Sequence, residues 1–186
     1  PAADPTSWPN YRGPDHNGIS KEAAIQTTWP ADGPKVLWKA KVGEGYSGIT
    51  VVNKKAYTLG NEGDKDTVFC FDAEKGTVLW SKTYDCPKAG GGYGGPRATP
   101  AIDNGIVYTF SNNGILNAWK ADTGDAVYTK TLAKDLGAKA PQWGFSSSAI
   151  ADGNTLFVNI ATGGIALNKA DGSILWKSAA GVSGYA

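Results

Sequence analysis

Short apolar runs of strand length alternate with turn residues along the chain, and the alternation repeats at a fixed interval. The stretch at 72–80, Asp-Ala-Glu-Lys-Gly-Thr-Val-Leu-Trp, recurs in related form at 120–128 and 168–176. Its glycine stands at positions 76, 124 and 172, so both intervals are 48 residues (124 − 76 and 172 − 124). An aromatic residue follows four places after each glycine, at Trp80, Tyr128 and Trp176. A fixed period of this length with strand-like content is typical of β-propeller blades.

Each repeat predicts four strands. A strand of small residues comes first, at 48–52, 98–102 and 146–150, as suits the crowded innermost position next to a propeller axis. A turn rich in Asn, Asp, Gly or Lys leads to an apolar second strand. The third strands end at Phe71, Trp119 and Leu167, and the recurring stretch forms the turn into the fourth. No segment shows the 3.6-residue apolar period of a helix. We therefore predict an all-β fold with four-stranded antiparallel blades at 46–84, 96–132 and 144–178.

The segments outside the three predicted blades are expected to lie at the ends of the partial propeller. Residues 1–34 are rich in proline and carry isolated large side chains, which predicts an extended N-terminal arm packed on the domain. Residues 35–42 read as a fourth strand without its blade, and 181–186 resemble the start of a further blade. A propeller needs four to eight blades. The partial propeller at 35–186 is therefore expected to be part of a larger ring of seven or eight blades, or to be completed by another chain at its open blade edges.

Composition narrows the class of protein. The 186 residues include 41% hydrophobic and 19% charged residues, with a net charge of +1, which is ordinary for a globular domain and gives no basic stripe for nucleic acid. No apolar run approaches the length of a membrane span. Methionine is absent, also at position 1, which suggests a removed signal peptide and a periplasmic or secreted location, with trimming of another kind as the alternative.

The two cysteines, Cys70 and Cys86, are expected to be free thiols. Cys70 falls on a third strand and Cys86 beyond the far end of a fourth strand. At about 3.3 Å per residue the two would lie near 20 Å apart if both strands ran straight, which is beyond the reach of a disulfide. We predict one thiol in the core and one in a loop.

The approach to each innermost strand carries aromatic residues and one arginine. In a propeller these positions share one face, near the mouth of the central channel, where the glycine-rich stretch 87–95 also passes. Aromatic faces with an arginine can hold a flat ligand, a sugar or a peptide carboxylate; the alternative is that the rings only fill gaps between blades. The candidate ligand-binding residues are Tyr46, Tyr93, Arg97, Trp143 and Tyr185.

The residues offer little support for a catalytic triad, a phosphate loop or a metal site. His16 is the only histidine and lies in the arm, so the sequence lacks the histidines that a Ser-His-Asp triad in the propeller or a zinc site would need. The glycine-rich stretch lacks the Gly-Lys-Ser/Thr ending of a phosphate loop. The acidic turn residues do not follow the spacing of a calcium loop. We predict no catalytic residue and no metal ligand.

The three copies of turn, glycine and aromatic-ended strand resemble the repeat of the PQQ-binding-like β-propeller family. That family includes quinoprotein dehydrogenases and the propeller lipoprotein of the outer-membrane β-barrel assembly machinery. Within it the chain is similar to exported proteins with the signature Trp-Pro-Asn-Tyr-Arg-Gly-Pro at 8–14, and the stretches 95–100 and 143–148 are similar to that subgroup too. The resemblance implies a propeller fold, export, and packing of Trp80, Tyr128 and Trp176 between adjacent blades.

The chain departs from the enzymes of that family at two places. Quinoprotein alcohol dehydrogenases typically carry an acidic residue just before an Ala-Thr-Pro strand start, where this chain has Arg97, and they carry adjacent cysteines beside the quinone, which this chain lacks. We therefore predict no cofactor, with PQQ and calcium as the alternative.

These observations predict an exported β-propeller scaffold for binding or assembly, which engages a protein or polymer ligand at the channel face. The first alternative is a part of a PQQ-dependent quinoprotein oxidoreductase, and only in that case would the chain act in an enzyme. The second is a structural arc that assembles with copies of itself through its open edges.

Overall fold

The computed structural model describes residues 7–23, 26–88, 93–160, 163–179 and 184–185, and its strands form three four-stranded antiparallel sheets. Each sheet keeps its strands in chain order. The first contains β1 (Thr50–Val52), β2 (Lys55–Glu62), β3 (Lys65–Asp72) and β4 (Val78–Asp85). The second contains β5 (Ala101–Asp103), β6 (Ile106–Phe110), β7 (Ile115–Lys120) and β8 (Ala126–Thr131). The third contains β9 (Ile150–Asp152), β10 (Thr155–Val158), β11 (Ile165–Asn168) and β12 (Ile174–Lys177).

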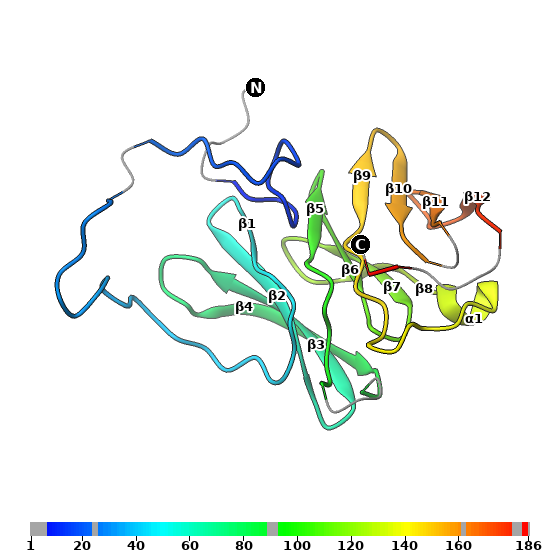
Figure 1. Ribbon diagram of the computed structural model, residues 1–186, viewed down its shortest axis with the longest axis horizontal. Helices are drawn as coiled ribbons and strands as arrows, with labels where there is room; N and C mark the ends of the chain where they lie inside the picture. The colour runs from blue at the N-terminus through cyan, green and yellow to red at the C-terminus, as the bar shows by residue number, and fades with distance from the viewer. Residues whose placement is uncertain (1–6, 24–25, 89–92, 161–162, 180–183, 186) are drawn as a thin grey trace.

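The sheets lie side by side as the blades of a partial propeller. Strand β1 contacts β5, and β5 contacts β9, so the first strand of each sheet faces a shared axis (Figure 1). The described strands do not close a ring, because within this part of the chain the first and third sheets each have one face without a neighbouring sheet. The all-β partial propeller that the sequence predicts is confirmed.

Two apolar clusters hold neighbouring sheets together. Between the first and second sheets the buried side chains include Tyr57, Val68 and Trp119. Between the second and third sheets they include Phe110 and Leu156. The second strands β2 and β6 are largely buried, whereas β10 alternates between buried and partly buried residues. Strands β4 and β8 at the outer rim include many exposed positions.

The constant spacing of glycine and aromatic residue within the three repeats has a direct packing cause. The ring of Trp80 lies on Gly124 and the ring of Tyr128 lies on Gly172, so that a Cβ at either glycine would come within 2.6 or 2.8 Å of the ring. The turn also needs a positive φ, which is 69° at Gly124 and 67° at Gly172. The indole Nε1 of Trp80 donates a hydrogen bond of 2.9 Å to the carbonyl oxygen of Ala121. The fourth strands of the first two sheets therefore dock on the last turn of the next sheet.

Trp176 differs from the other two aromatic residues of this set. It was expected to pack between blades, but its side chain is 51% exposed, against 8% for Trp80. The reason is that the described part of the chain provides no turn glycine beyond β12. The ring instead lies beside Phe157 of its own sheet, at 6.4 Å between ring centroids.

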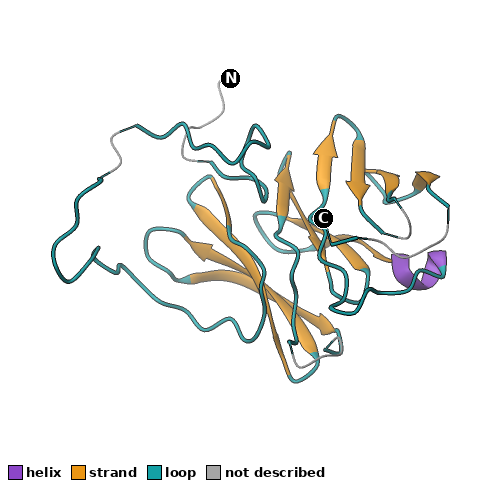
Figure 2. Ribbon diagram, in the orientation of Figure 1, coloured by secondary structure: helices purple, strands orange, loops and turns teal. Residues whose placement is uncertain are grey.

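The predicted strand at 35–42 has no regular strand structure (Figure 2). The described residues supply no sheet beside it with which it could pair. Its Trp38 nevertheless lies on Gly76 and donates from Nε1 to the carbonyl oxygen of Ala73 at 2.9 Å, as Trp80 does one repeat later. The segment thus keeps the docking contact of a fourth strand without the strand.

The N-terminal arm contacts the sheets only over part of its length. Trp8 and Val51 exchange two backbone hydrogen bonds, and the carbonyl oxygen of Pro9 accepts one from Ile102. Residues 26–37 are almost entirely exposed and turn away from the sheets (Figure 1). The arm therefore packs on the sheets through Trp8 and Pro9, whereas residues 26–37 do not show the expected packing.

Two local features of the secondary structure differ from expectation. The first strands are shorter and begin two to four residues later than predicted. Residues before them also bond between sheets, as the N–H of Gly48 does to Thr99 Oγ1. A short helix, α1 (Leu132–Leu136), follows β8; five residues cannot show a helical period. Cys86 lies in the loop after β4 and Cys70 lies in the core, as predicted; both are free thiols, and Cys86 is also fully buried.

Candidate functional site

The five candidate residues of the channel face form one connected group, which we call the mouth cluster: Tyr46, Tyr93, Arg97, Trp143 and Tyr185. Arg97 lies at its centre. Its Nε donates to the carbonyl oxygen of Trp143 and its Nη2 to that of Tyr93, both at 2.6 Å. Its guanidinium carbon lies 4.8 Å from the centroid of the Tyr46 ring, a cation–π distance. Arg97 therefore fixes the approach segments of all three sheets relative to one another.

Ring contacts complete the mouth cluster. Tyr93 lies 6.4 Å from Tyr46 and meets Trp143 edge to face at 5.4 Å, measured between centroids. The hydroxyl of Tyr185 accepts a hydrogen bond from the backbone N–H of Trp143 at 3.1 Å. Tyr46, Tyr93 and Tyr185 are nevertheless 55%, 56% and 48% exposed. In the described structure about half of each of these tyrosine side chains is therefore accessible to solvent.

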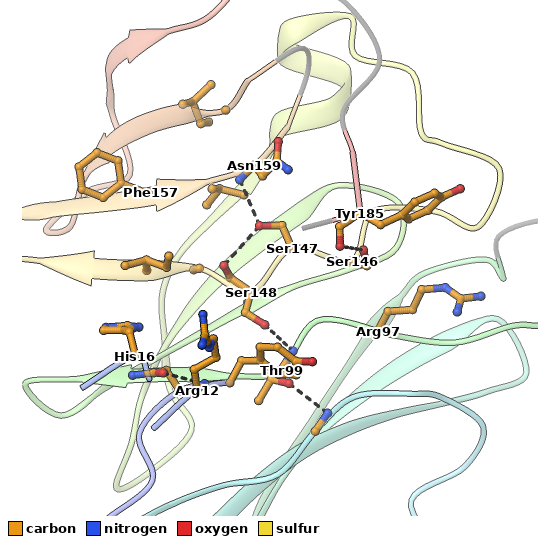
Figure 3. A pocket seen from close by; sticks show the side chains of 18 of the residues that line it. Arg12, His16, Arg97, Thr99, Ser146, Ser147, Ser148, Phe157, Asn159 and Tyr185 are labelled. Carbon is orange, nitrogen blue, oxygen red and sulfur yellow. Dashed lines mark hydrogen bonds between the residues drawn. The ribbon is translucent and has the colours of Figure 1, made fainter. Parts of the chain in front are cut away.

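A cavity of about 940 Å³ extends from the mouth cluster along the inner strands (Figure 3). Tyr46, Arg97, Trp143 and Tyr185 line it, whereas Tyr93 contacts these residues without lining the cavity itself. The chain's two arginines and its one histidine, Arg12, Arg97 and His16, all line this cavity, and no Asp or Glu of the described residues does. The described wall is therefore rich in hydrogen-bond donors and carries no negative side chain.

Hydroxyl groups tie the inner strands together along this cavity. The Oγ1 of Thr99 accepts from the backbone N–H of Gly48 at 3.2 Å, and the Oγ of Ser148 accepts from the N–H of Thr99 at 3.0 Å. Figure 3 shows Thr99, Ser147 and Ser148 along the cavity wall. The sequence indicated small residues at these positions but not their role as bonds between blades. The sequence feature from which these bonds could have been predicted is the hydroxyl residue that stands just before the first strand in successive repeats.

The arm lines one end of the cavity with four residues that the sequence did not place at the site, Asn10, Tyr11, Arg12 and His16. The Oδ1 of Asn10 accepts from the N–H of Arg12 at 3.0 Å, and the carbonyl oxygen of Asn10 accepts from Gly13 at 3.1 Å. This turn, with φ of 77° at Gly13, brings Arg12 and His16 to the end of the cavity opposite Arg97 and Tyr185 (Figure 3). Both side chains are exposed to the cavity and to solvent. The Asn-Tyr-Arg-Gly sequence at 10–13, which is typical of a turn, is the feature from which this placement could have been predicted.

The buried titratable groups lie away from the cavity. Asp66 is fully buried and accepts hydrogen bonds from Asn61 Nδ2 at 2.7 Å and from the Tyr84 hydroxyl at 3.3 Å. Burial raises the pKa of Asp66 above its ordinary value. Burial also raises the pKa of the Cys86 thiol to about 12, so it stays protonated and unreactive at neutral pH. These groups serve the packing of the first two sheets.

The described residues hold no group of three or more His, Cys, Asp or Glu side chains that could bind a metal ion. None of the helical segments described here has the length and apolar character needed to cross a membrane. The glycine-rich stretch 87–95, expected to pass over the mouth, lies partly outside the described residues at 89–92.

Solved structures with the same fold include quinoproteins and an assembly factor. A europium-containing methanol dehydrogenase aligns with a TM-score of 0.56 and 16% identity over 76% of this chain and 26% of its own length. Quinohemoprotein alcohol dehydrogenase from Comamonas testosteroni aligns with a TM-score of 0.55 and 20% identity over 72% of this chain and 20% of its own length. BamB from Moraxella catarrhalis aligns with a TM-score of 0.50 and 19% identity over 72% of this chain and 36% of its own length. The chain thus spans between about a fifth and about a third of these proteins, and identities this low show the fold alone.

Among curated protein sequences nothing matches significantly. The sequence profile of one protein family, described as outer membrane protein assembly factor BamB, matches residues 25–176, which is most of the chain and all three sheets up to Trp176. The chain therefore belongs to this BamB-like family of PQQ-type β-propeller repeats.

Proposed function

We propose that the chain is a binding module of an exported propeller protein, and that the mouth cluster holds a segment of a protein or polymer ligand. The observation that carries this proposal is that Arg97 binds the backbone of Tyr93 and Trp143 and faces the ring of Tyr46, while the tyrosines of the cluster remain about half exposed. A rigid, half-exposed aromatic surface loses little side-chain entropy when a ligand binds, which favours affinity.

The family relationship supports the same proposal. The described channel wall offers aromatic faces, hydroxyls and cationic side chains, which suit recognition of a polar chain. The family description names an assembly factor, and a protein ligand at the channel face fits such a role. We extend the proposal to a periplasmic or secreted location with a removed signal peptide.

The quinoprotein alternative fits the described residues poorly. The cofactor and its calcium ion need oxygen ligands, and the described cavity wall contributes no carboxylate. Arg97 stands where the enzymes have an acid and is engaged with two backbone carbonyl oxygens. Cys70 and Cys86 are separate buried thiols, not an adjacent pair.

The open face of the third sheet supports a further contact. Ile174, Leu175 and Trp176 of β12 are 43%, 56% and 51% exposed. We propose that a further sheet covers β12, from the rest of the ring or from another chain. An arc that pairs only with copies of itself is the structural alternative.

Binding at the mouth cluster is tested by the double replacement Tyr46→Ala with Tyr93→Ala. Because both side chains are more than half exposed, we expect the melting temperature to fall by less than about 4 °C, a shift that corresponds to roughly 1 kcal/mol. Labelled protein is applied to peptide and oligosaccharide arrays, and the variant is expected to lose most of the signal of the wild type. An unfolded variant, or unchanged array binding, would show that the rings serve packing alone.

A further inference from the structure

The three innermost strands present equivalent backbone groups to the channel. Val51, Ile102 and Ala151 are each the middle residue of their strand, and each pairs with the second residue of the neighbouring strand across a two-residue turn. In such a hairpin the pair next to the turn is hydrogen-bonded and the following pair is not. The N–H and C=O groups of these three residues therefore point away from their own sheet.

The arm occupies two of these three positions. Val51 donates to the carbonyl oxygen of Trp8 at 3.0 Å and accepts from its N–H at 2.6 Å. Ile102 donates to the carbonyl oxygen of Pro9 at 2.8 Å. Among the described residues Ala151 has no such partner, because the arm turns back at Asn10 after passing β5. Within the described part of the chain, the inner edge of β9 is therefore left without a backbone partner.

The open edge lies beside the cationic end of the cavity. Ser148 and Ile150, which lead into and begin β9, line the same cavity as Arg12 and His16. Figure 3 shows Arg12 and His16 next to Thr99, on the side of the cavity where Ser148 lies. The acid nearest to them in the arm sequence, Asp15, forms an ion pair with Lys21 at 2.5 Å and does not line the cavity. Because no described carboxylate lines this cavity, the Arg12 guanidinium is available there to an anionic group of a ligand.

We propose that an extended acidic peptide adds to the inner edge of β9, with its backbone on Ala151 and a Glu or Asp carboxylate on Arg12 and His16. This rests on the proposed binding function and names the ligand class. A peptide is favoured over an acidic sugar because the arm shows that these inner edges accept peptide backbone at the two equivalent positions. The arginine fork binds a carboxylate with two parallel hydrogen bonds, and the histidine N–H can add a third.

The probe is a fluorescein-labelled octapeptide of alternating Glu and Val, titrated with the full chain by fluorescence anisotropy. Its matched neutral probe replaces every Glu by Gln. We expect the acidic peptide to bind at least about tenfold more tightly, because a hydrogen bond to a charged group contributes on that order. Equal affinity for the two peptides would overturn the proposal.

Two variants separate the carboxylate contact from the backbone contact. Arg12→Gln should weaken binding of the acidic peptide about tenfold or more, and it should leave the fold intact because the side chain is exposed. Ala151→Pro removes the free N–H without removing a ladder bond and should also weaken binding about tenfold. The controls are Ala151→Ser, which keeps the N–H, and Lys139→Ala, an exposed cation outside the cavity.

The outcomes distinguish this inference from the proposed function. Wild-type affinity in either Arg12→Gln or a folded Ala151→Pro variant would overturn the peptide mode. An oligogalacturonate that binds in an Arg12-dependent way, while the acidic peptide does not, would show that the site takes acidic sugars instead. If neither probe binds but array binding still depends on Tyr46 and Tyr93, this inference fails and the binding module stands.

Discussion

Replacement of Trp80 by alanine is expected to lower the free energy of unfolding by about 3–5 kcal/mol. The side chain is 8% exposed and its ring lies on Gly124, 6.0 Å from the ring of Tyr57. Truncation removes this packing and leaves a cavity between the first and second sheets. It also removes one of the two side-chain donors to the buried carbonyl oxygen of Ala121, the other being the Tyr57 hydroxyl at 3.2 Å.

Trp176 provides the matched control because it is the same residue at the same place in the repeat. Its side chain is 51% exposed, so Trp176→Ala should cost less than about 1 kcal/mol. Urea denaturation followed by far-ultraviolet circular dichroism measures both variants. Equal losses in the two variants would show that docking on the next turn is not what makes the repeated aromatic important.

Replacement of Gly124 by alanine is expected to cost about 2–4 kcal/mol, from two sources. The residue has a φ of 69°, which a side chain disfavours, and the new Cβ would lie 2.6 Å from the Trp80 ring. The ring cannot move away without breaking its hydrogen bond to Ala121. The same denaturation experiment measures the loss.

Gly105 separates these two sources. Its φ is 76°, close to that of Gly124, but a Cβ there would meet nothing within 4 Å. Gly105→Ala should therefore cost only the backbone term, about 1–2 kcal/mol. If both variants lose the same amount, the backbone conformation alone explains the glycine and the contact with Trp80 does not limit stability.

The repeat made the sheets predictable, because its period fixes where each turn glycine and each fourth strand must lie. The third strands end within one residue of Phe71, Trp119 and Leu167, as predicted. The mouth cluster was also predictable in its membership, since equivalent positions in successive repeats must meet around one axis. The sequence did not indicate that Arg97 also binds backbone carbonyl oxygens within the cluster.

Features that depend on contacts between distant segments could not be read from the repeat. Arg12 and His16 reach the cavity through a turn of the arm, which has no counterpart in the other repeats. Burial of Cys86 depends on the second sheet, where Asn112 Oδ1 accepts from its thiol at 3.2 Å. Exposure of Trp176 depends on whether another sheet packs against β12, which a repeated pattern cannot reveal.

The most direct test of the site is amide hydrogen exchange at the three inner edges, measured residue by residue by NMR. We expect slow exchange at Val51 and Ile102, whose N–H groups donate to the arm, and fast exchange at Ala151, whose N–H has no acceptor among the described residues. Exchange at Ala151 as slow as at Val51 would show that this edge is already occupied and would contradict the proposed site.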